Sequence, residues 1–261
     1  MAHLGAPPSQ GESVTAAPAI AIVFAGGVGS RMLGAERPKQ FLEVQGKPLL
    51  VHTLDRFQQH PDVSAIYLSC LESYVEQAWE LARIWGIDKV VRVIPGGASA
   101  QESIFLGLCA ARDDGVPDDA VVLVHDGVRP LINARLISDN IATARSHGNA
   151  ITSIPCFETI ARSVDGAETI ESVTRREQMH ILQAPQTFLL GHAWKHNTRS
   201  VSDGLLGSFV DQAQLARHYG EQLHMVAGFR GNVKITTDLD LLQLRILAES
   251  GHLADVVGPE R

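Results

Sequence analysis

The chain has 261 residues, of which 45% are apolar and 20% are charged, as in an ordinary globular protein with one large domain. Its 22 Lys and Arg against 29 Asp and Glu give a net charge of −7, which argues against a broad nucleic-acid-binding surface. Cys70, Cys109 and Cys156 form no CxxC pair, which argues against disulfides or a cysteine zinc site and favours the cytoplasm. No apolar run is long enough to predict a membrane span.

Apolar runs alternate with helical patterns in the first part of the chain. Residues 1–18 lack the basic and apolar segments of a signal peptide, so a disordered leader is expected there. Short apolar runs, typical of buried parallel strands, occupy residues 19–25, 65–69, 90–93, 120–124 and 150–154. Helical patterns separate them at residues 49–60, 74–85, 101–112 and 134–146. This alternation predicts an α/β fold with a mostly parallel sheet covered on both faces.

The alternation stops after Ile154. Residues 155–185 are short polar and β-branched pieces with a turn expected at Asp165-Gly166, which indicates a protruding hairpin arm. The chain then continues with helices near residues 191–198 and 210–219, a strand at VKITT (233–237), and a last helix at 239–250 that a Thr237–Asp240 capping box opens. The expected organisation is a leader (1–18), one domain (19–250) with its arm at about 155–185, and a loose tail (251–261).

Glycines and cations follow the first predicted strand. Gly26, Gly27 and Gly29 lie in the segment AGGVGSRM, and Arg31 and Lys39 come after them. Glycine allows backbone N–H groups to face an anion, so one interpretation is a polyphosphate cradle with two cations. The other interpretation is a tight turn followed by a surface arginine and lysine.

Several familiar motifs do not fit the sequence. The dinucleotide pattern GxGxxG fails because Met32 stands where its third glycine belongs, and the P-loop pattern fails because proline follows Gly46-Lys47. His192 and His196 lie at i and i+4, but HAWKH lacks the glutamate of a zinc-protease motif, which favours surface histidines. No GxSxG elbow of a serine hydrolase occurs.

Two further segments place charges near predicted strands. In VVLVHDGVRP, Asp126 follows a buried strand, where open α/β sheets bind their ligands. A lone carboxylate there suits Mg²⁺, with Arg129 as a partner for an anion, but an Asp turn residue paired with Arg129 is the alternative. In GNVKITTDLDL, Lys234 lies among apolar residues and needs a partner, which is either a buried phosphate or a nearby Asp or Glu.

Taken as an ordered set, these segments resemble one enzyme family. The set is AGGVGSRM, PKQF, GKPLLVHTL, a double glycine followed by Ser103, HDGVRP, APQTF and NVKITT, and it runs from about Ala19 to Leu247. It is similar to the cytidylyltransferases that act on 2-C-methyl-D-erythritol 4-phosphate and to their relatives that act on D-ribitol 5-phosphate. The resemblance implies a three-layer α/β/α sandwich of the Rossmann-like nucleotidyltransferase type, with a mixed, mainly parallel sheet. It also implies a homodimer in which a β-arm is exchanged.

The resemblance further implies an activity. CMP would move from CTP to a small polyol phosphate, with Mg²⁺ as the cofactor and pyrophosphate as the second product. The first acceptor it suggests is 2-C-methyl-D-erythritol 4-phosphate, an intermediate of isoprenoid biosynthesis. D-ribitol 5-phosphate, which would give CDP-ribitol, is the alternative.

Carried over position by position, the resemblance implies three neighbouring parts of one site. The CTP triphosphate would lie against a glycine loop with two catalytic cations, which are Ala25, Gly26, Gly27, Gly29, Arg31 and Lys39. The cytosine would lie beside Gly97 and Ser103. Asp126 would bind Mg²⁺, and Lys234 would be the third catalytic cation. The acceptor would meet Arg129, Thr159 and Arg176, the last reaching over from the partner subunit.

Three positions depart from the family pattern. Ala100 stands where the family has Arg, and Ala184 and Val210 stand where it has threonines near the acceptor. Val128, a longer first loop and EQMHILQ are similar to the ribitol branch, although generic features of the methylerythritol branch fit about as well. The departures leave open a nucleotide-binding protein whose catalysis has decayed. A nucleotidyltransferase that uses another NTP is a further alternative.

Overall fold

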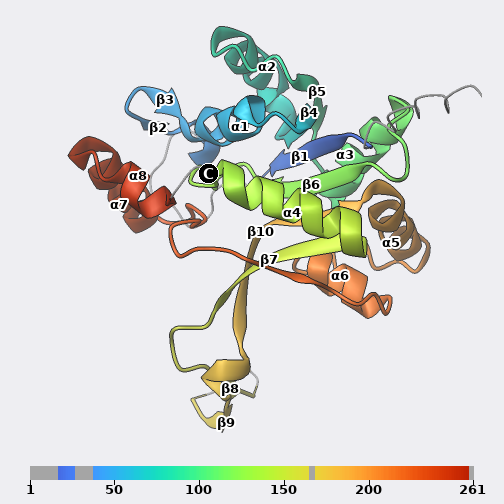
Figure 1. The fold of residues 1–261 in the computed structure, drawn as a ribbon, viewed down its shortest axis with the longest axis vertical. Coiled ribbons are helices and arrows are strands. Elements are labelled where there is room, and N and C mark those ends of the chain that lie inside the picture. Colours follow the sequence, from blue (N-terminus) through green and yellow to red (C-terminus); the bar gives the residue numbers. More distant parts are fainter. Residues whose placement is uncertain (1–16, 27–37, 165–167, 259–261) are drawn as a thin grey trace, which may run out of the picture.

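The structure is a computed structural model that describes residues 17–26, 38–164 and 168–258. A seven-stranded sheet forms its middle layer, in the order β11-β7-β10-β6-β1-β4-β5 (Figure 1). The strands in chain order are β1 (Ala19–Ala25), β4 (Val63–Cys70), β5 (Val90–Pro95), β6 (Val121–Asp126), β7 (Asn149–Pro155), β10 (His180–Leu189) and β11 (Met225–Ala227). β10 is antiparallel to both of its neighbours, and the other pairs of this sheet are parallel. The prediction of a mixed, mainly parallel sheet is confirmed.

Helices cover both faces because the strands are apolar on both sides. One face packs against α1 (Leu49–Gln59), α2 (Val75–Ile84) and α4 (Ala134–His147), and the other against α3 (Ala100–Asp113), α5 (Leu190–Ser202) and α6 (Gln212–His218). In β1, Ala21 and Val23 belong to the first core and Ile20 and Ile22 to the second, and none is more than 1% exposed. The strands and helices predicted before residue 155 are confirmed, with ends shifted by at most two residues.

A smaller apolar cluster holds the C-terminal part of the chain. α8 (Leu253–Val257) packs against α7 (Asp238–Ser250), and Val257 is only 2% exposed. Asn133 Nδ2 also donates a hydrogen bond to the Val257 carbonyl at 2.7 Å. The expectation of a loose tail from residue 251 is therefore wrong for these residues, because their apolar side chains pack against α7.

The segment VKITT, predicted as a strand, is not one. It meets the loop after β6 through a single backbone hydrogen bond, from the Ile235 N–H to the Val128 carbonyl (2.9 Å), and residues 233–237 pair with no strand of the described sheets. A strand requires a repeated ladder with a neighbour, and one bond anchors a segment without making it a strand. The following helix, α7, begins at the predicted capping box of Thr237 and Asp240.

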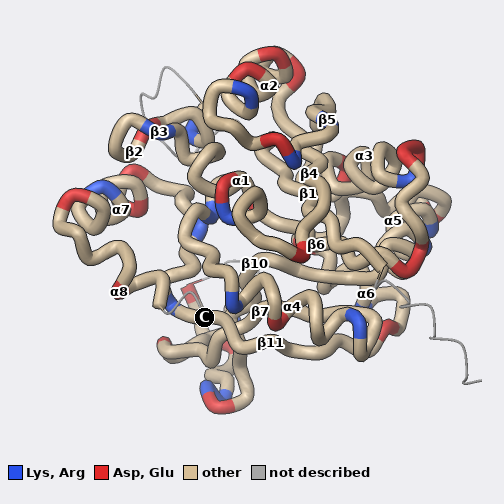
Figure 2. The backbone as a smooth tube through the Cα atoms, turned by 45° about the horizontal axis from the view of Figure 1, so that its top comes forward, with Lys and Arg blue, Asp and Glu red and all other residues tan. Residues whose placement is uncertain are grey.

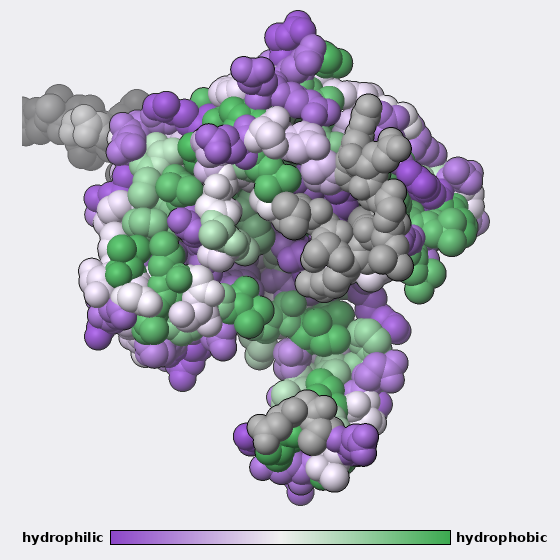
Figure 3. Space-filling view, turned by 180° about the vertical axis from the view of Figure 1, so that it is seen from behind, coloured by the Kyte–Doolittle hydropathy of each residue, from purple (hydrophilic) through white to green (hydrophobic). Residues whose placement is uncertain are grey.

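An arm leaves the sheet between β7 and β10, in the place expected for it (Figure 1). Its tip carries the antiparallel pair β8 (Ala161–Ser163) and β9 (Ile170–Val173), all of whose side chains are exposed. Figure 3 shows the arm standing away from the body of the domain. The predicted Asp165-Gly166 turn lies outside the described residues, as does almost all of the predicted leader.

Charge is mixed over the surface of the described residues. Figure 2 shows Lys and Arg interspersed with Asp and Glu on helices such as α2 and α7, without one broad basic face. None of the described helices combines the length and the hydropathy that crossing a membrane would need. The remaining short elements are β2 (Glu43–Val44), β3 (Lys47–Pro48), η1 (Lys39–Phe41), η2 (Glu72–Tyr74) and η3 (Arg176–Gln178).

Candidate active site

Two cavities meet at the carboxyl ends of β1 and β6, the edge where open α/β sheets bind ligands. The larger cavity has a volume of about 500 Å³ and lies towards the glycine segment after β1. The smaller cavity has a volume of about 200 Å³ and lies towards β10 and α6. The residues that line both cavities are Phe24, Ala100, Asp126 and Lys234.

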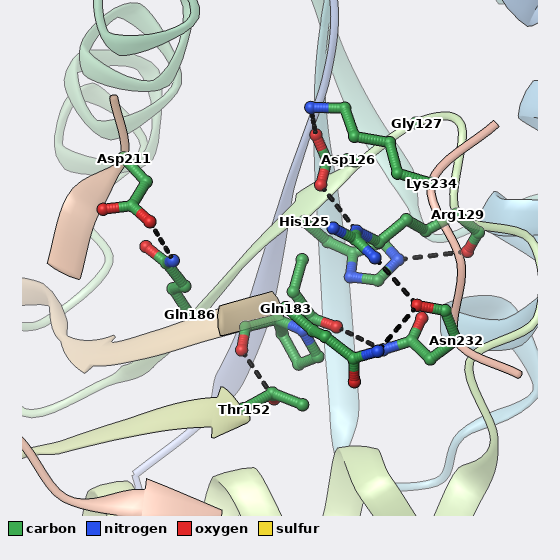
Figure 4. A network of polar contacts seen from close by, with 12 residues as sticks. His125, Asp126, Gly127, Arg129, Thr152, Gln183, Gln186, Asp211, Asn232 and Lys234 are labelled. Atoms are coloured by element: carbon green, nitrogen blue, oxygen red, sulfur yellow. Dashed lines mark hydrogen bonds and ion pairs between the residues drawn. The ribbon is translucent and has the colours of Figure 1, made fainter. Parts of the chain in front are cut away.

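Asp126 forms the centre of a charged cluster at this junction (Figure 4). It is the last residue of β6, and its side chain is 8% exposed. Lys234 Nζ lies 2.6 Å from its Oδ1, and Arg129 Nε lies 2.9 Å from its Oδ2. Burial raises the pKa of the Asp126 carboxyl, but the charges and hydrogen bonds of Arg129 and Lys234 outweigh burial, so the pKa falls below its ordinary value. The carboxyl is therefore ionised at neutral pH.

Both pairings that the sequence left open thus occur: Asp126 pairs with Arg129, and Lys234 has an acidic partner. Pairing does not remove these groups from the site, because Asp126 and Lys234 line both cavities and Arg129 lines the smaller one. The side chain of Lys234 is 41% exposed, which leaves it reachable by a ligand.

Hydrogen bonds from side chains to backbone carbonyls hold the charged cluster in place. Arg129 Nη1 donates to the Asn232 carbonyl at 2.8 Å, and Gln183 Nε2 donates to the same oxygen at 3.1 Å. Asn232 Nδ2 in turn donates to the Ala184 carbonyl at 2.7 Å. Segment 232–234 is thereby held between the end of β6 and β10, which brings Lys234 to Asp126 (Figure 4).

His125 neighbours the charged cluster but faces the core. Its ring is completely buried, packs edge-on against Phe57, and has Nε2 3.2 Å from the Arg129 carbonyl. Burial lowers its pKa to about 4, so the ring is neutral at pH 7. It lines neither cavity, which leaves it unsuited to proton transfer with a bound ligand.

The larger cavity brings together most of the residues assigned to CTP. The described members are Ala25, Gly26, Lys39, Gly97 and Ser103. Gly27, Gly29 and Arg31 lie outside the described residues. Gln40, for which the sequence alone suggested no role, also lines this cavity and donates to the Ala25 carbonyl at 2.7 Å. Its place beside Lys39 in the PKQF segment was the available signal.

The first turn of α3 forms one wall of the larger cavity. Ser99 caps the helix by accepting from the Glu102 N–H at 3.1 Å, and Ser103 Oγ accepts from the Gly97 N–H at 3.1 Å. A side chain at Gly97 would collide with Glu102, since an added Cβ would lie 2.2 Å from its Cγ. The positive end of a 14-residue helix therefore faces the cavity close to Lys39 and Lys234, an arrangement that favours an anion.

The smaller cavity contains polar groups that the sequence did not single out. They are Gln101, Gln183, Gln186, Asp211 and Gln212. Ala184 and Val210, the two positions that depart from the family pattern, also line it. Thr159 and Arg176, assigned to the acceptor, do not line either cavity: they lie in the exposed arm.

The donor set at the junction fits a magnesium ion that is held mainly by phosphates. The carboxylate of Asp126 is a hard oxygen donor, and each of its oxygens keeps capacity beyond the ion pair it makes. Among the described residues there is no cluster of three or more His, Cys, Asp or Glu that could hold a metal by itself. A site with one protein carboxylate is the kind that Mg²⁺ completes with substrate phosphates and water.

Comparison with known proteins gives one consistent family. The sequence profile described as "IspD: 2-C-methyl-D-erythritol 4-phosphate cytidylyltransferase" matches residues 19–249. The ribitol-5-phosphate cytidylyltransferase of Vibrio parahaemolyticus serotype O3:K6 (strain RIMD 2210633) is 37% identical over 239 residues, covering 92% of this chain and 99% of that protein. The 2-C-methyl-D-erythritol 4-phosphate cytidylyltransferase of Geotalea uraniireducens (strain Rf4) is 37% identical over 223 residues, covering 85% and 93%.

A solved structure supports the same fold. The crystal structure named 4-diphosphocytidyl-2C-methyl-D-erythritol synthase, from Anaerococcus prevotii DSM 20548, superposes with a TM-score of 0.76. The superposition covers 90% of this chain and 100% of the Anaerococcus chain, at 23% sequence identity. The two chains therefore share the three-layer architecture.

Proposed function

Because the chain belongs to the 2-C-methyl-D-erythritol 4-phosphate cytidylyltransferase (IspD) family, we propose that it transfers CMP from CTP to the phosphate of a small polyol phosphate and releases pyrophosphate. The observation that supports this most directly is the pair of cavities joined at Asp126 and Lys234. CTP would occupy the larger cavity and the acceptor the smaller one, so that their phosphates meet at the junction.

The chemistry needs positioned cations more than it needs a base. A phosphate monoester is largely ionised at pH 7, so its oxygen can attack the α-phosphorus in line while pyrophosphate leaves from the opposite side. Lys39 lines the larger cavity and Lys234 lines both, where they can stabilise the developing charge. The neutral, buried state of His125 is consistent with a reaction that uses no histidine base.

Mg²⁺ is the proposed cofactor, with Asp126 as its protein ligand. When bound, it would neutralise charge on the CTP phosphates. Arg129 and Lys234 hold the carboxylate ionised and in place between the cavities. We expect the enzyme to act in the cytoplasm, in keeping with its three free cysteines.

D-ribitol 5-phosphate is the acceptor we favour, and 2-C-methyl-D-erythritol 4-phosphate is the second candidate. The Vibrio relative and the Streptococcus agalactiae relatives named for ribitol 5-phosphate align over 239 residues, and the Geotalea relative named for the methylerythritol substrate aligns over 223. The second candidate is favoured by the family description itself. Ala184 and Val210 in the smaller cavity are the positions where the acceptor's surroundings depart from the family pattern.

An acceptor panel tests the proposed function. With CTP and Mg²⁺, we expect the enzyme to form pyrophosphate and a CDP-polyol. We expect kcat/KM for D-ribitol 5-phosphate to be at least about tenfold above that for the methylerythritol phosphate, because a mismatched group on the substrate lowers kcat/KM by roughly tenfold. Coupled pyrophosphate release and mass spectrometry measure this, with reactions lacking acceptor as controls. CTP binding without any transfer would support a decayed enzyme, and faster transfer from UTP, ATP or GTP would reassign the nucleotide.

We also propose that the protein works as a homodimer in which the arm of one subunit completes the site of the other. Arm residues 161–163 and 170–173 are exposed, and Ile170 and Val173 are 66% and 61% exposed. A small hairpin with exposed apolar residues gains little from its own packing and is stabilised by a partner surface. Within the part of the chain that the structure describes, Arg176 lines neither the larger nor the smaller cavity of its own subunit. This supports a role for Arg176 in the site of the partner subunit.

Subunit complementation tests that arrangement. Arg176→Ala and Lys39→Ala should each lower activity, and mixing the two after subunit exchange should restore it at about a quarter of the sites, because half of the dimers would be mixed and each would keep one intact site. Activity is followed by CDP-polyol formation, and native mass spectrometry verifies the mixed dimer. A verified mixed dimer without recovered activity would place Arg176 in its own subunit's site or outside any site.

A further inference from the structure

Gln101 is a buried polar side chain that nothing in the described part of the chain satisfies. It lies in the first turn of α3, it is 1% exposed, and neither its Nε2 nor its Oε1 has a hydrogen-bond partner among the described residues. Buried amide groups are normally paired, because leaving them unpaired costs free energy. Gln101 lines the smaller cavity, so a molecule bound there is the natural partner for its amide.

The other polar groups of the smaller cavity are largely occupied, and Gln212 Oε1 accepts from Asn197 Nδ2 at 2.9 Å. Gln186 donates from Nε2 to Asp211 Oδ2 at 2.8 Å and accepts from the Ala213 N–H at 2.9 Å. The second oxygen of Asp211, Oδ1, accepts from the Gln214 N–H at 2.8 Å, which caps α6. These two side chains are therefore committed to holding α6 against β10.

Gln183 differs from Gln101 in the hydrogen-bonding atoms that it leaves free for a bound molecule. Its Nε2 is used by the Phe229 and Asn232 carbonyls, and its unpaired Oε1 lies against Gly228, 2.3 Å from where a Cβ on that glycine would stand. Within the described lining of the smaller cavity, Gln101 thus has an amide whose donor and acceptor are both unengaged.

The chemistry of an amide indicates what it binds. A hydroxyl group both donates and accepts a hydrogen bond. A primary amide can accept from it and donate to it, whereas an ammonium only donates and a carboxylate only accepts. The phosphate of an acceptor already has cations in the lining of the smaller cavity, in Arg129 and Lys234. Ala184 and Val210 offer no side-chain hydrogen bond beside it.

We infer that Gln101 hydrogen-bonds hydroxyl groups of the acceptor's polyol chain and is the main side chain by which the enzyme requires those hydroxyls. The inference rests on the proposed function for the identity of the bound molecule. The smaller cavity then has two kinds of recognition group: Arg129 and Lys234 for the phosphate, and Gln101 for the hydroxyls.

The test combines a side-chain change with a substrate change. Gln101→Met keeps the unbranched shape and helix propensity and removes both hydrogen-bonding atoms, and the probes are the acceptor that the wild-type enzyme uses and its 2-deoxy and 3-deoxy counterparts. For the wild type, removing the contacted hydroxyl should lower kcat/KM roughly tenfold to a hundredfold. In Gln101→Met, kcat/KM for the intact acceptor should fall by a similar factor, and removing that hydroxyl should then have almost no further effect. The KM for CTP should change less than about twofold, because the change leaves the larger cavity intact.

Controls separate binding from stability. Gln59→Leu replaces an exposed glutamine at the end of α1 and should leave all of these constants unchanged. Gln101→Leu, together with thermal melting of each variant, serves if Gln101→Met folds poorly. The inference would be overturned if the variants lowered kcat/KM, relative to the wild type, by the same factor for the intact and the deoxy acceptors. It would also be overturned if they lowered neither value. If the wild type transfers CMP to no polyol phosphate, the proposed function fails first, and the inference falls with it.

Discussion

Replacing Lys234 with alanine is expected to lower kcat by roughly 10²–10³, the usual loss when one preorganised charge-stabilising group is removed. Lys234 lines both cavities and lies 2.6 Å from Asp126, so it is placed where the phosphates of the two substrates would meet. Its contribution grows as charge develops in the transition state, which is why kcat should fall more than substrate binding. Single-turnover pyrophosphate release at saturating CTP measures the effect.

The fold should survive this change because the Lys234 side chain is 41% exposed and its removal leaves no internal cavity. Lys195→Ala, an exposed lysine of α5, is the matched control and should retain full activity. Lys39→Ala should lose activity on the same scale, since Lys39 lines the larger cavity. Normal turnover by Lys234→Ala would show that segment 233–237 lies outside the reacting centre.

Replacing Asp126 with asparagine should raise the Mg²⁺ concentration for half-maximal activity by about tenfold or more, because the variant keeps the shape and loses the charge that attracts the ion. The same change leaves Arg129, whose side chain is 12% exposed, without its anionic partner. The free energy of unfolding should therefore fall by up to about 3 kcal/mol. A Mg²⁺ titration at fixed CTP and a urea denaturation curve measure the two effects.

These two readouts distinguish a metal ligand from a structural ion pair. Arg129→Gln removes one partner of Asp126 but keeps the carboxylate, so it should lower stability while changing the Mg²⁺ requirement much less. If Asp126→Asn leaves the metal dependence at the wild-type value, the metal site must be sought elsewhere in the larger cavity.

Part of the nucleotide side could be predicted from local signals. These are the glycines after β1 and the acidic residue at the end of β6, whereas Gly97 and Ser103, near the start of α3, were assigned by family resemblance. The parallel sheet brings the ends of β1 and β6 to one edge. Ala25, Gly26, Lys39, Gly97 and Ser103 accordingly line one cavity. The assignments of Thr159 and Arg176 came from family resemblance and stay predictions.

The acceptor side could not be predicted in the same way. β10 inserts antiparallel between β6 and β7, and this places Ala184 and Gln186 beside Asp126. Strand order depends on which edges pair in the folded chain, and a local hydrophobic pattern contains no information on it. The strand predicted at 233–237 failed for a related reason: its residues alternate as a strand's do, but the fold offers them a single backbone bond.

The sequence by itself determined the alternating α/β layers, the arm, and the family to which the chain belongs, because periodicity and ordered motifs are properties of short segments. Only the tertiary structure decided that Lys234 meets Asp126, that Arg129 reaches the Asn232 carbonyl 103 positions away, and that the amide of Gln101 lacks a partner among the residues the structure describes. Whether a buried polar atom is satisfied depends on groups distant in the chain that packing alone brings within hydrogen-bond range.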